Sequence, residues 1–279
     1  MNVFKTHLAL NTFLEQHAPA STGLVPTMGA LHSGHLSLVK KACDENDWVI
    51  VSIFVNPTQF DDPNDLKKYP KTLPADLDQL ARLKEKLVVY APNEDDLYPN
   101  NTTPKNYPLG PLATLMEGAS RNGHFQGVAT VVHKLFNAFN PSRAYFGEKD
   151  FQQLQIIRQL VALENLSVQI VNCPIVREAS GLAMSSRNVR LSPQQQQKAP
   201  LIYQTLTTAR KNKTTESPQQ ITSDVTAFFQ NHPAFELDYF CIVDSKTLQP
   251  VERFLPQQEN RAFIAVKMGE VRLIDNIKF

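Results

Sequence analysis

Residues 22–35, TGLVPTMGALHSGH, decide the fold of the first part of the chain. Residues 22–28 form a short apolar run with the composition of a strand, and residues 34–46, GHLSLVKKACDEN, repeat apolar side chains at helical spacing. Gly29 and Gly34 lie in the connecting segment, where glycine lets the backbone approach a ligand closely. The stretch therefore predicts a strand, a tight turn and an amphipathic helix.

The alternation of strand and helix patterns continues to about residue 173. Strands are expected at 47–55, 87–91, 143–146 and 167–173, and helices at 74–86, 127–139 and 151–164. Because alternating strands and helices form right-handed β-α-β units, the pattern predicts an α/β domain with a parallel sheet covered on both faces. Ligands of such open sheets bind at the carboxyl ends of the strands.

The pattern changes near residue 174, which divides the chain into predicted domains at 1–174 and 175–279. Ser192-Pro193 and Ser217-Pro218 each resemble a helix N-cap followed by Pro at the first helical position. They predict one helix to about residue 210, distorted at Pro200, and another at 217–230. Strands are expected at 236–243, 261–267 and 271–275. The second domain is therefore predicted to be a smaller α+β domain.

Composition limits the classes of function. Of 279 residues, 42% are hydrophobic and 20% are charged, which is typical of globular domains, and the formal net charge is +1. Lys and Arg form no basic stripe, so no nucleic-acid partner is expected. No apolar run approaches membrane-spanning length, so no membrane association is expected. The odd, scattered set Cys43, Cys173 and Cys241 is typical of a reducing compartment, and a cytoplasmic location is expected.

The predicted turn carries His32 and His35, three residues apart at the start of a helix, so both imidazoles can face the same side. Backbone N–H groups and the positive end of the helix dipole favour phosphate at this place. Imidazole can donate a hydrogen bond to the charge that develops as pyrophosphate leaves. The plainer alternatives are a zinc pair and simple capping of the helix. Zinc needs a third ligand that no nearby Cys or His supplies, and the combination of strand, turn, HxGH spacing and helix favours a phosphate site.

Two further clusters have side chains suited to small polar ligands. Residues 56–60, NPTQF, follow the most apolar strand, and Gln59 offers both a donor and an acceptor. Residues 183–187, AMSSR, lie in the second predicted domain. The hydroxyls of Ser185 and Ser186 and the guanidinium of Arg187 suit a phosphate chain. Each cluster taken alone is also typical of an ordinary loop.

A third cluster, Gly147-Glu148-Lys149-Asp150, follows the strand predicted at 143–146. Lys149 offers a positive charge to a phosphate. Asp150 is expected to cap the next helix, and Gln153 stands at the spacing of a capping box. Function and capping are both open for Asp150 and Gln153, although their place at the carboxyl end of a strand favours function.

The His turn resembles the HIGH signature of the nucleotidylyl-transferase superfamily, which includes class I aminoacyl-tRNA synthetases, and residues 183–187 take the place of its KMSKS-like loop. Six stretches carry a narrower resemblance: LVPTMGALHSGH (24–35), FVNPTQF (54–60), GHFQGVATVV (123–132), YFGEKDFQQL (145–154), VREASGLAMSSRN (176–188) and RLIDN (272–276). They span nearly the whole chain. The sequence therefore resembles the pantothenate synthetase (pantoate–β-alanine ligase) family.

This resemblance implies an N-terminal Rossmann-like domain, a smaller C-terminal α+β lid domain and a homodimer. It implies ATP-dependent condensation of (R)-pantoate with β-alanine through a pantoyl adenylate, releasing pyrophosphate and AMP, within pantothenate and coenzyme A biosynthesis. Mg²⁺ is expected to assist, held largely by phosphate oxygens and water. The sequence assigns this ion no protein ligand, and Asp76 is only a weak candidate.

The resemblance also implies roles for individual residues. His35 matches a proton donor, and His32 and Lys149 are the other catalytic candidates. Gln59 and Gln153 match pantoate-binding glutamines, and Gln59 is expected beside β-alanine as well. Arg121 matches an arginine near the site. The implied ATP contacts are Met28, Gly29, Ala30, Leu31, His32, Ser33, Gly34, His35, Gly147, Glu148, Lys149, Asp150, Val176, Met184, Ser185, Ser186 and Arg187.

Three rival functions share parts of this pattern. A nucleotidyltransferase acting on a phosphate acceptor shares HxGH, but it needs cationic groups where this chain has Gln59 and Gln153. A synthetase-like RNA binder is disfavoured by the near-neutral charge and the short chain. A nucleotide sensor without catalysis is disfavoured because both phosphate motifs are intact.

Overall fold

The computed structural model describes residues 1–83, 86–100 and 102–279, and the chain divides into two compact units, Met1–Pro174 and Ile175–Phe279. The strands of the first unit are β1 (Asn2–Phe4), β2 (Thr22–Thr27), β3 (Trp48–Ile53), β4 (Leu87–Tyr90), β5 (Arg143–Gly147) and β6 (Gln169–Cys173). Its α-helices are α1 (His7–His17), α2 (Ser33–Glu45), α3 (Pro63–Lys68), α4 (Leu73–Ala81), α5 (Glu94–Leu97), α6 (Glu117–Ser120), α7 (His124–Phe139) and α8 (Phe151–Leu163). Short 3-10 turns are η1 (Pro57–Gln59), η2 (Gly110–Ala113) and η3 (Glu148–Asp150).

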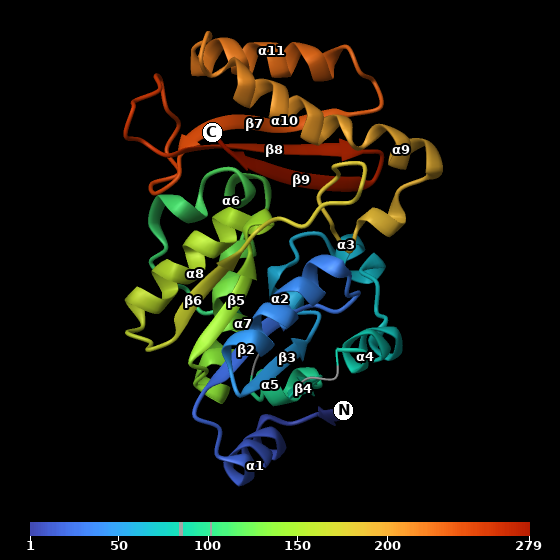
Figure 1. Ribbon diagram of the computed structural model, residues 1–279, viewed down its shortest axis with the longest axis vertical. Helices are drawn as coiled ribbons and strands as arrows, with labels where there is room; N and C mark the ends of the chain where they lie inside the picture. Colours follow the sequence, from blue (N-terminus) through green and yellow to red (C-terminus); the bar gives the residue numbers. More distant parts are fainter. Residues whose placement is uncertain (84–85, 101) are drawn as a thin grey trace. The chain divides into compact units, whose positions relative to one another are not determined.

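The six strands of the first unit form one sheet in the order β1-β4-β3-β2-β5-β6 (Figure 1). All neighbouring strands are parallel, as the alternating sequence pattern predicted. The chain winds outward from β2 to β3 and β4 and then returns to place β5 on the other side of β2. The winding direction therefore reverses beside β2, and the carboxyl ends of β2 and β5 form the crevice in which such sheets bind ligands.

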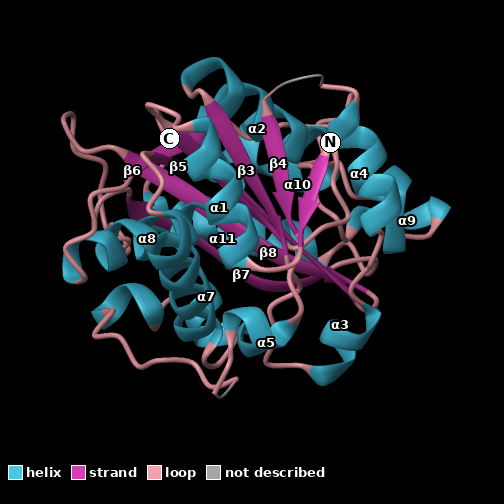
Figure 2. Cartoon of the chain, turned by 90° about the horizontal axis from the view of Figure 1, so that it is seen from below, coloured by secondary structure: helices cyan, strands magenta, loops and turns pink. Residues whose placement is uncertain are grey.

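Helices cover both faces of this sheet (Figure 2). On one face, helices α2 and α4 pack against alternate strand residues in a buried cluster that includes Val25, Val49, Val51, Val89, Leu38 and Leu80. On the other face the intervening strand residues are buried, and the ring of Tyr90 lies 4.9 Å from that of Phe139 in α7. Because each large apolar side chain contributes about 1.5–3 kcal/mol when buried, these two cores hold the strand ends rigidly in place.

The second unit joins helices to an antiparallel sheet with the strand order β7-β8-β9. Its elements are η4 (Asn188–Arg190), α9 (Pro193–Lys198), α10 (Leu201–Asn212), α11 (Pro218–Gln230), β7 (Glu236–Asp244), β8 (Asn260–Met268) and β9 (Val271–Lys278). Leu206 and Phe229 of the helices share a buried core with Ile264 of β8. The predicted fold class, a parallel-sheet α/β domain of the Rossmann type with a smaller α+β part, is confirmed.

Some element boundaries differ from the sequence expectations. The helix predicted at 127–139 begins at His124, and the helix predicted at 74–86 ends at Ala81, its residues 84–85 lying outside the described residues. The helix predicted to distort at Pro200 is divided there into α9 and α10. Strand β1 and helix α1 were not predicted, because strand β1 is only three residues long and helix α1 has few apolar repeats. No helix among the described residues is both long enough and apolar enough to cross a bilayer.

Candidate functional site

Three candidate loops of the first unit follow neighbouring strands of the sheet. The turn after β2 contains His32 and His35, the loop after β3 contains Gln59, and the loop after β5 contains Lys149. Since β2 lies between β3 and β5, the parallel register brings these loops to one edge of the sheet. Electrostatic coupling supports this placement, because the charge of Lys149 acts on both imidazoles. The candidate site therefore lies at the reversal point of the fold.

The backbone of the turn after β2 takes an unusual course. Gly29 has φ of +80° and Ala30 has φ of +49°, so two consecutive residues occupy the left-handed region. That conformation costs about 1 kcal/mol or more for alanine, and it persists only where surrounding contacts impose it. The contacts come from Asp76 of α4, which accepts hydrogen bonds from the N–H of Ala30 at 3.0 Å and of Leu31 at 2.8 Å. Thr72 also donates to this carboxylate.

Asp76 is therefore a structural anchor of the turn. Its side chain is buried at 1% exposure, and both carboxylate oxygens accept hydrogen bonds. A Cβ at Gly29 would lie 3.1 Å from the Asp76 Oδ2 atom, so the close approach itself favours glycine. The sequence made Asp76 a weak candidate for contact with Mg²⁺. In the structure, both of its carboxylate oxygens hold the turn by accepting backbone hydrogen bonds.

His32, the N-cap residue of α2, and His35, in the first turn of this helix, cap its N-terminus. The His32 Nδ1 atom accepts the Gly34 N–H at 3.1 Å, and the His35 Nδ1 atom accepts the His32 N–H at 3.4 Å. Together they form a reciprocal capping box built from imidazoles. The ring centroids lie 4.0 Å apart with a 33° tilt, so the two rings face the same side, as the spacing predicted. The alternative that these histidines cap the helix is therefore correct for their Nδ1 atoms, while their Nε2 atoms take no part in the capping.

This capping defines the protonation of both rings. A ring nitrogen that accepts a hydrogen bond carries no proton, so each neutral imidazole holds its proton on Nε2. Burial, followed by the charge of Lys149, lowers the pKa of His32 to about 4. Burial, followed by the neighbouring His32 and then Lys149, lowers the pKa of His35 to about 3. Near neutral pH the turn therefore presents two uncharged N–H donors from its Nε2 atoms.

The loop after β5 forms the 3-10 turn η3 before helix α8 begins at Phe151. Asp150 makes no side-chain capping bond to this helix, so the capping-box expectation for Asp150 and Gln153 is wrong. The 3-10 turn replaces the extended cap geometry that a capping box requires. The Asp150 carboxylate instead lies 3.7 Å from Lys149 Nζ, and Glu148 accepts a hydrogen bond from Asn172 of β6 at 2.6 Å.

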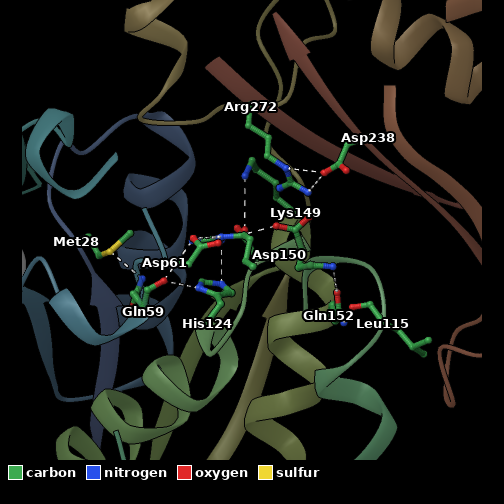
Figure 3. Close-up of polar contacts among 12 residues, drawn as sticks. Met28, Gln59, Asp61, Leu115, His124, Lys149, Asp150, Gln152, Asp238 and Arg272 are labelled. Carbon is green, nitrogen blue, oxygen red and sulfur yellow. Dashed lines mark hydrogen bonds and ion pairs between the residues drawn. The ribbon is translucent and has the colours of Figure 1, made fainter. Parts of the chain in front are cut away.

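The loop after β3 holds Gln59 at 8% exposure. Its Nε2 atom donates to the Met28 sulfur at 2.9 Å (Figure 3). Its Oε1 atom accepts from Asn56 Nδ2 at 3.2 Å. Gln59 and Met28, both predicted site residues, are therefore in direct contact. A Cβ at Gly127 of α7 would lie 2.1 Å from the Thr58 carbonyl oxygen, so only glycine lets the helix lie against this loop. Gln153 lies partly buried in the first turn of α8.

Two residues around Gln59 form a chain of hydrogen bonds. Arg121 Nη1 lies 3.0 Å from His124 Nε2, and His124 Nδ1 lies 2.8 Å from the Gln59 carbonyl oxygen. Arg121 was a predicted site residue, whereas His124 was missed although it stands in the stretch 123–132. The only sequence signal was its place in that stretch, because the helix was predicted to begin three residues later, at 127.

The second phosphate-binding candidate belongs to the second unit. Residues 176–184 form a hairpin in which the Met184 N–H donates to the Val176 carbonyl at 3.0 Å. Arg177 of this hairpin makes a paired contact with Asp275 of β9, with N–O distances of 2.6 and 2.9 Å, and its guanidinium lies 3.7 Å from the Tyr203 ring centroid. These contacts fasten the start of the hairpin to the antiparallel sheet.

The loop that carries the phosphate candidates follows this hairpin. Asn188 donates to the Glu178 carboxylate at 2.8 Å and to the Ala183 carbonyl at 3.1 Å, which closes the loop on itself. Ser185 Oγ accepts the Arg187 N–H at 3.2 Å, and Ser186 is buried at 9% exposure. The loop is thus an ordered turn that carries two hydroxyls and a guanidinium.

The acidic side chains near the candidate loops do not form a metal centre. Within the described part of the chain, no group of three or more His, Cys, Asp or Glu side chains is arranged to hold a metal ion. Asp76 is engaged by backbone N–H groups, and Asp150 lies beside Lys149. Both carboxylates are thus engaged within the protein, and the expectation that Mg²⁺ is held largely by phosphate oxygens and water stays a prediction.

Comparisons with known proteins place the chain in a family. A family model described as Pantoate-beta-alanine ligase matches residues 2–278. The pantothenate synthetase of Flavobacterium psychrophilum is 48% identical over 279 residues, which cover 99% of each chain. The crystal structure of pantothenate synthetase from Thermus thermophilus matches with a TM-score of 0.92 and 41% identity, covering 99% of each chain.

A second solved structure has ligands in its description. Pantoate-β-alanine ligase from Francisella tularensis, complexed with β,γ-ATP and β-alanine, matches with a TM-score of 0.82 and 38% identity, covering 99% of this chain and 97% of that chain. The sequence matches, the shared fold and the three loops at one sheet edge agree with one another. The chain belongs to the pantoate–β-alanine ligase family, whose reaction condenses pantoate with β-alanine with the use of ATP.

Proposed function

We propose that this chain makes pantothenate in two steps at the loops described above. A carboxylate oxygen of (R)-pantoate first attacks the α-phosphorus of ATP, which forms pantoyl adenylate and breaks the bond to pyrophosphate. The amine of β-alanine then attacks the acyl carbon, which forms the amide, releases AMP and loses a proton. Adenylation supplies a good leaving group, so the second step requires no side-chain nucleophile. A site that excludes water protects the reactive adenylate from hydrolysis.

The pair of neutral imidazoles is the observation that carries this proposal. Because the Nδ1 atoms of His32 and His35 accept the capping hydrogen bonds, each ring offers an N–H donor at its Nε2 atom. Donors held in place before the reaction stabilise the charge that develops on pyrophosphate, and they need no reorganisation during the step. Their low pKa values mean that His35 acts as a hydrogen-bond donor without first taking up a proton. Lys149 supplies the full positive charge for the same phosphates.

The remaining ATP contacts are proposed from the turn and the loops. The backbone of residues 28–35, with Met28, Gly29, Ala30, Leu31, Ser33 and Gly34, takes up the nucleotide at the start of α2. Gly147, Glu148 and Asp150 contribute beside Lys149. In the second unit we assign phosphate and nucleotide contacts to Val176, Met184, Ser185, Ser186 and Arg187, with the Arg187 guanidinium able to bind phosphate through two N–H groups.

Gln59 and Gln153 are proposed to bind pantoate, and Gln59 to contact β-alanine as well. Gln59 is buried, and its amide is already oriented by Asn56 and Met28. A carboxamide that is fixed in this way can bind a hydroxyl and a carboxylate oxygen of one small substrate. A phosphorylated second substrate would need a cation at this position instead, so the arrangement favours pantoate over a phosphate acceptor.

Further parts of the proposal concern Mg²⁺, the assembly and the second unit. Mg²⁺ is proposed to be held largely by the phosphate oxygens of ATP and by water, as this ion usually is at nucleotide sites, and we derive no step through the ion. A homodimer in the cytoplasm is proposed from the family resemblance. The second unit is proposed to act as a lid that covers the nucleotide.

Isotope exchange between pyrophosphate and ATP tests the proposed function. With Mg²⁺ and ATP present, labelled pyrophosphate should enter ATP only when pantoate is added, because only adenylate formation is reversible through pyrophosphate. A matched incubation replaces pantoate with β-alanine and should show no exchange. Exchange that proceeds without pantoate would favour a nucleotidyltransferase, and complete absence of turnover would favour a nucleotide sensor.

A further inference from the structure

His124 is a buried histidine to which the reaction described above gives no role. It is the first residue of helix α7 and only 6% exposed. Its Nδ1 atom lies 2.8 Å from the Gln59 carbonyl oxygen (Figure 3). Its Nε2 atom lies 3.0 Å from Arg121 Nη1. The ring therefore stands between a guanidinium and the backbone of a proposed substrate-binding residue.

The chemistry of the two partners defines the tautomer of His124. A guanidinium can only donate, so Nε2 must accept from Arg121 and carries no proton. Nδ1 then holds the proton and donates it to the Gln59 carbonyl oxygen, which can only accept. Burial, followed by the charge of Arg121, lowers the pKa of the ring to about 4, while Gln59, Glu117 and Asp150 act in the opposite direction. The hydrogen bonds run in one direction from Arg121 to Gln59.

Arg121 is itself held on two sides. Its Nε atom lies 3.8 Å from the Asp61 carboxylate and its Nη1 atom lies 3.7 Å from Glu117, four residues earlier in α6. The guanidinium also reaches the Gln59 carbonyl oxygen directly at 3.4 Å. The chain of hydrogen bonds therefore begins at a group whose position is defined by two carboxylates.

The same helix holds the Gln59 loop at a second point. Gly127 is three residues beyond His124, on the same side of α7, and it lies against the backbone of Thr58 and Gln59. The Gly127 carbonyl accepts a hydrogen bond from Asn56 Nδ2 at 3.2 Å, and the same amide donates to Gln59 Oε1. The first turn of α7 thus contacts both the main chain and, through Asn56, the side chain of Gln59.

We propose that His124 is a positioning residue for pantoate binding, which it serves by fixing the Gln59 backbone through the hydrogen bond from Nδ1. The imidazole transmits the fixed position of Arg121 to Gln59 and has no contact with the reacting atoms. This inference rests on the proposed role of Gln59 in binding pantoate. It assigns to Arg121 an indirect role, in which its guanidinium orients the ring.

Steady-state kinetics of four variants test this role. His124→Ala should raise the KM for pantoate about tenfold, because the buried Gln59 carbonyl loses its 2.8 Å hydrogen bond and keeps only the longer one from Arg121, and it should leave the KM for ATP within about twofold. His124→Asn should restore most of the affinity, because its amide nitrogen is bonded to Cγ as Nδ1 is. His124→Gln places its amide near the Nε2 position, where it can still meet Arg121, and should resemble the alanine variant. Gln59→Ala is the reference for the loss of the substrate contact.

A double-mutant cycle separates positioning from general damage to the fold. If His124 acts through Gln59, the double variant with His124→Ala and Gln59→Ala should raise the KM for pantoate no more than Gln59→Ala alone does. The inference would be overturned if His124→Ala raised the KM for pantoate and the KM for ATP equally, or if the effects of His124→Ala and Gln59→Ala on the KM for pantoate were additive. Equal behaviour of His124→Asn and His124→Gln would overturn it as well. The Asn and Gln variants differ mainly in where the N–H group stands, so this comparison holds even if the alanine variant is unstable. A Gln59→Ala variant with normal pantoate kinetics would instead overturn the proposed role of Gln59.

Discussion

The two proposed phosphate-binding segments are built by different means. The turn at residues 28–35 lies at the end of a buried parallel strand, and a buried carboxylate holds its backbone in a left-handed conformation. The loop at residues 183–188 lies beside an antiparallel sheet, and an ion pair on the preceding hairpin holds it. The first segment offers uncharged imidazole donors, whereas the second offers hydroxyls and a guanidinium.

This difference indicates a division of labour between the two segments. Neutral donors that are fixed by helix capping are suited to stabilising a charge that appears only during the reaction. The guanidinium of Arg187 is charged before the step as well as during it and meets phosphates that are already negative, so we expect it to contribute mainly to affinity. We therefore expect changes in the turn to lower kcat and changes in the loop to raise the KM for ATP.

The largest effect is expected from His35→Ala. Removing the Nε2 donor should slow pantoyl adenylate formation by about a hundredfold to a thousandfold, with the KM for ATP little changed. Single-turnover formation of the adenylate measures it. His35→Gln, whose amide nitrogen stands near the Nε2 position, should retain more activity than the alanine variant, and exposed His17→Ala is the matched control. Full activity in His35→Ala would contradict the assigned role.

A smaller effect is expected from Asp76→Asn. The substitution turns one acceptor into a donor that faces the N–H of Ala30 or Leu31. An unsatisfied buried group costs about 1–3 kcal/mol, so kcat should fall by about tenfold and the melting temperature should drop. Asp78→Asn, two residues later on the same helix and exposed, is the control. If both variants behave alike, the carboxylate does not support the turn.

For the second loop, Arg177→Lys should give a milder loss. A lysine cannot reproduce the paired contact with Asp275 or the stacking on Tyr203, so the hairpin should loosen. We expect the KM for ATP to rise about threefold to tenfold while kcat stays within about twofold. Lys267→Ala removes the exposed pair with Glu236 and should change neither value. A fall in kcat with unchanged KM would remove the contrast between the two segments.

The smallest effect on activity is expected from pH. Because the pKa values of His32 and His35 lie at about 4 and about 3, both rings stay neutral between pH 8 and 6, and pyrophosphate exchange should not fall through their protonation. Stability should respond differently. In the unfolded chain both histidines take up protons below about pH 6.5, whereas the folded chain does not until about pH 4, so lowering the pH favours unfolding.

Denaturant unfolding at several pH values measures this loss. The free energy of unfolding should decline as the pH falls from about 6.5 towards 4, and the decline should be smaller in His35→Gln, which lacks one of the buried bases. A stability that is constant over this range, or a decline that is unchanged in the variant, would contradict the buried, neutral state of His35.

The strand patterns and the short motifs were sufficient to predict much of the fold. The alternation up to residue 173 predicted the parallel sheet, because burial on both faces produces apolar strands separated by amphipathic helices. Ser192 and Ser217 were correctly identified as N-caps, since capping depends on residues within one turn. The capping expectation for Asp150 was wrong, because a 3-10 turn precedes helix α8 and changes the local geometry.

By itself, the sequence determined the α/β class, the spacing of His32 and His35, and the motifs through which the family is recognised. These features depend on neighbours along the chain, and local patterns record them. Only the tertiary structure decided that Asp76 holds the turn, that both imidazoles carry their protons on Nε2, and that His124 joins Arg121 to Gln59. Protonation and hydrogen-bond partners depend on burial and on residues distant in sequence, which a linear pattern does not specify.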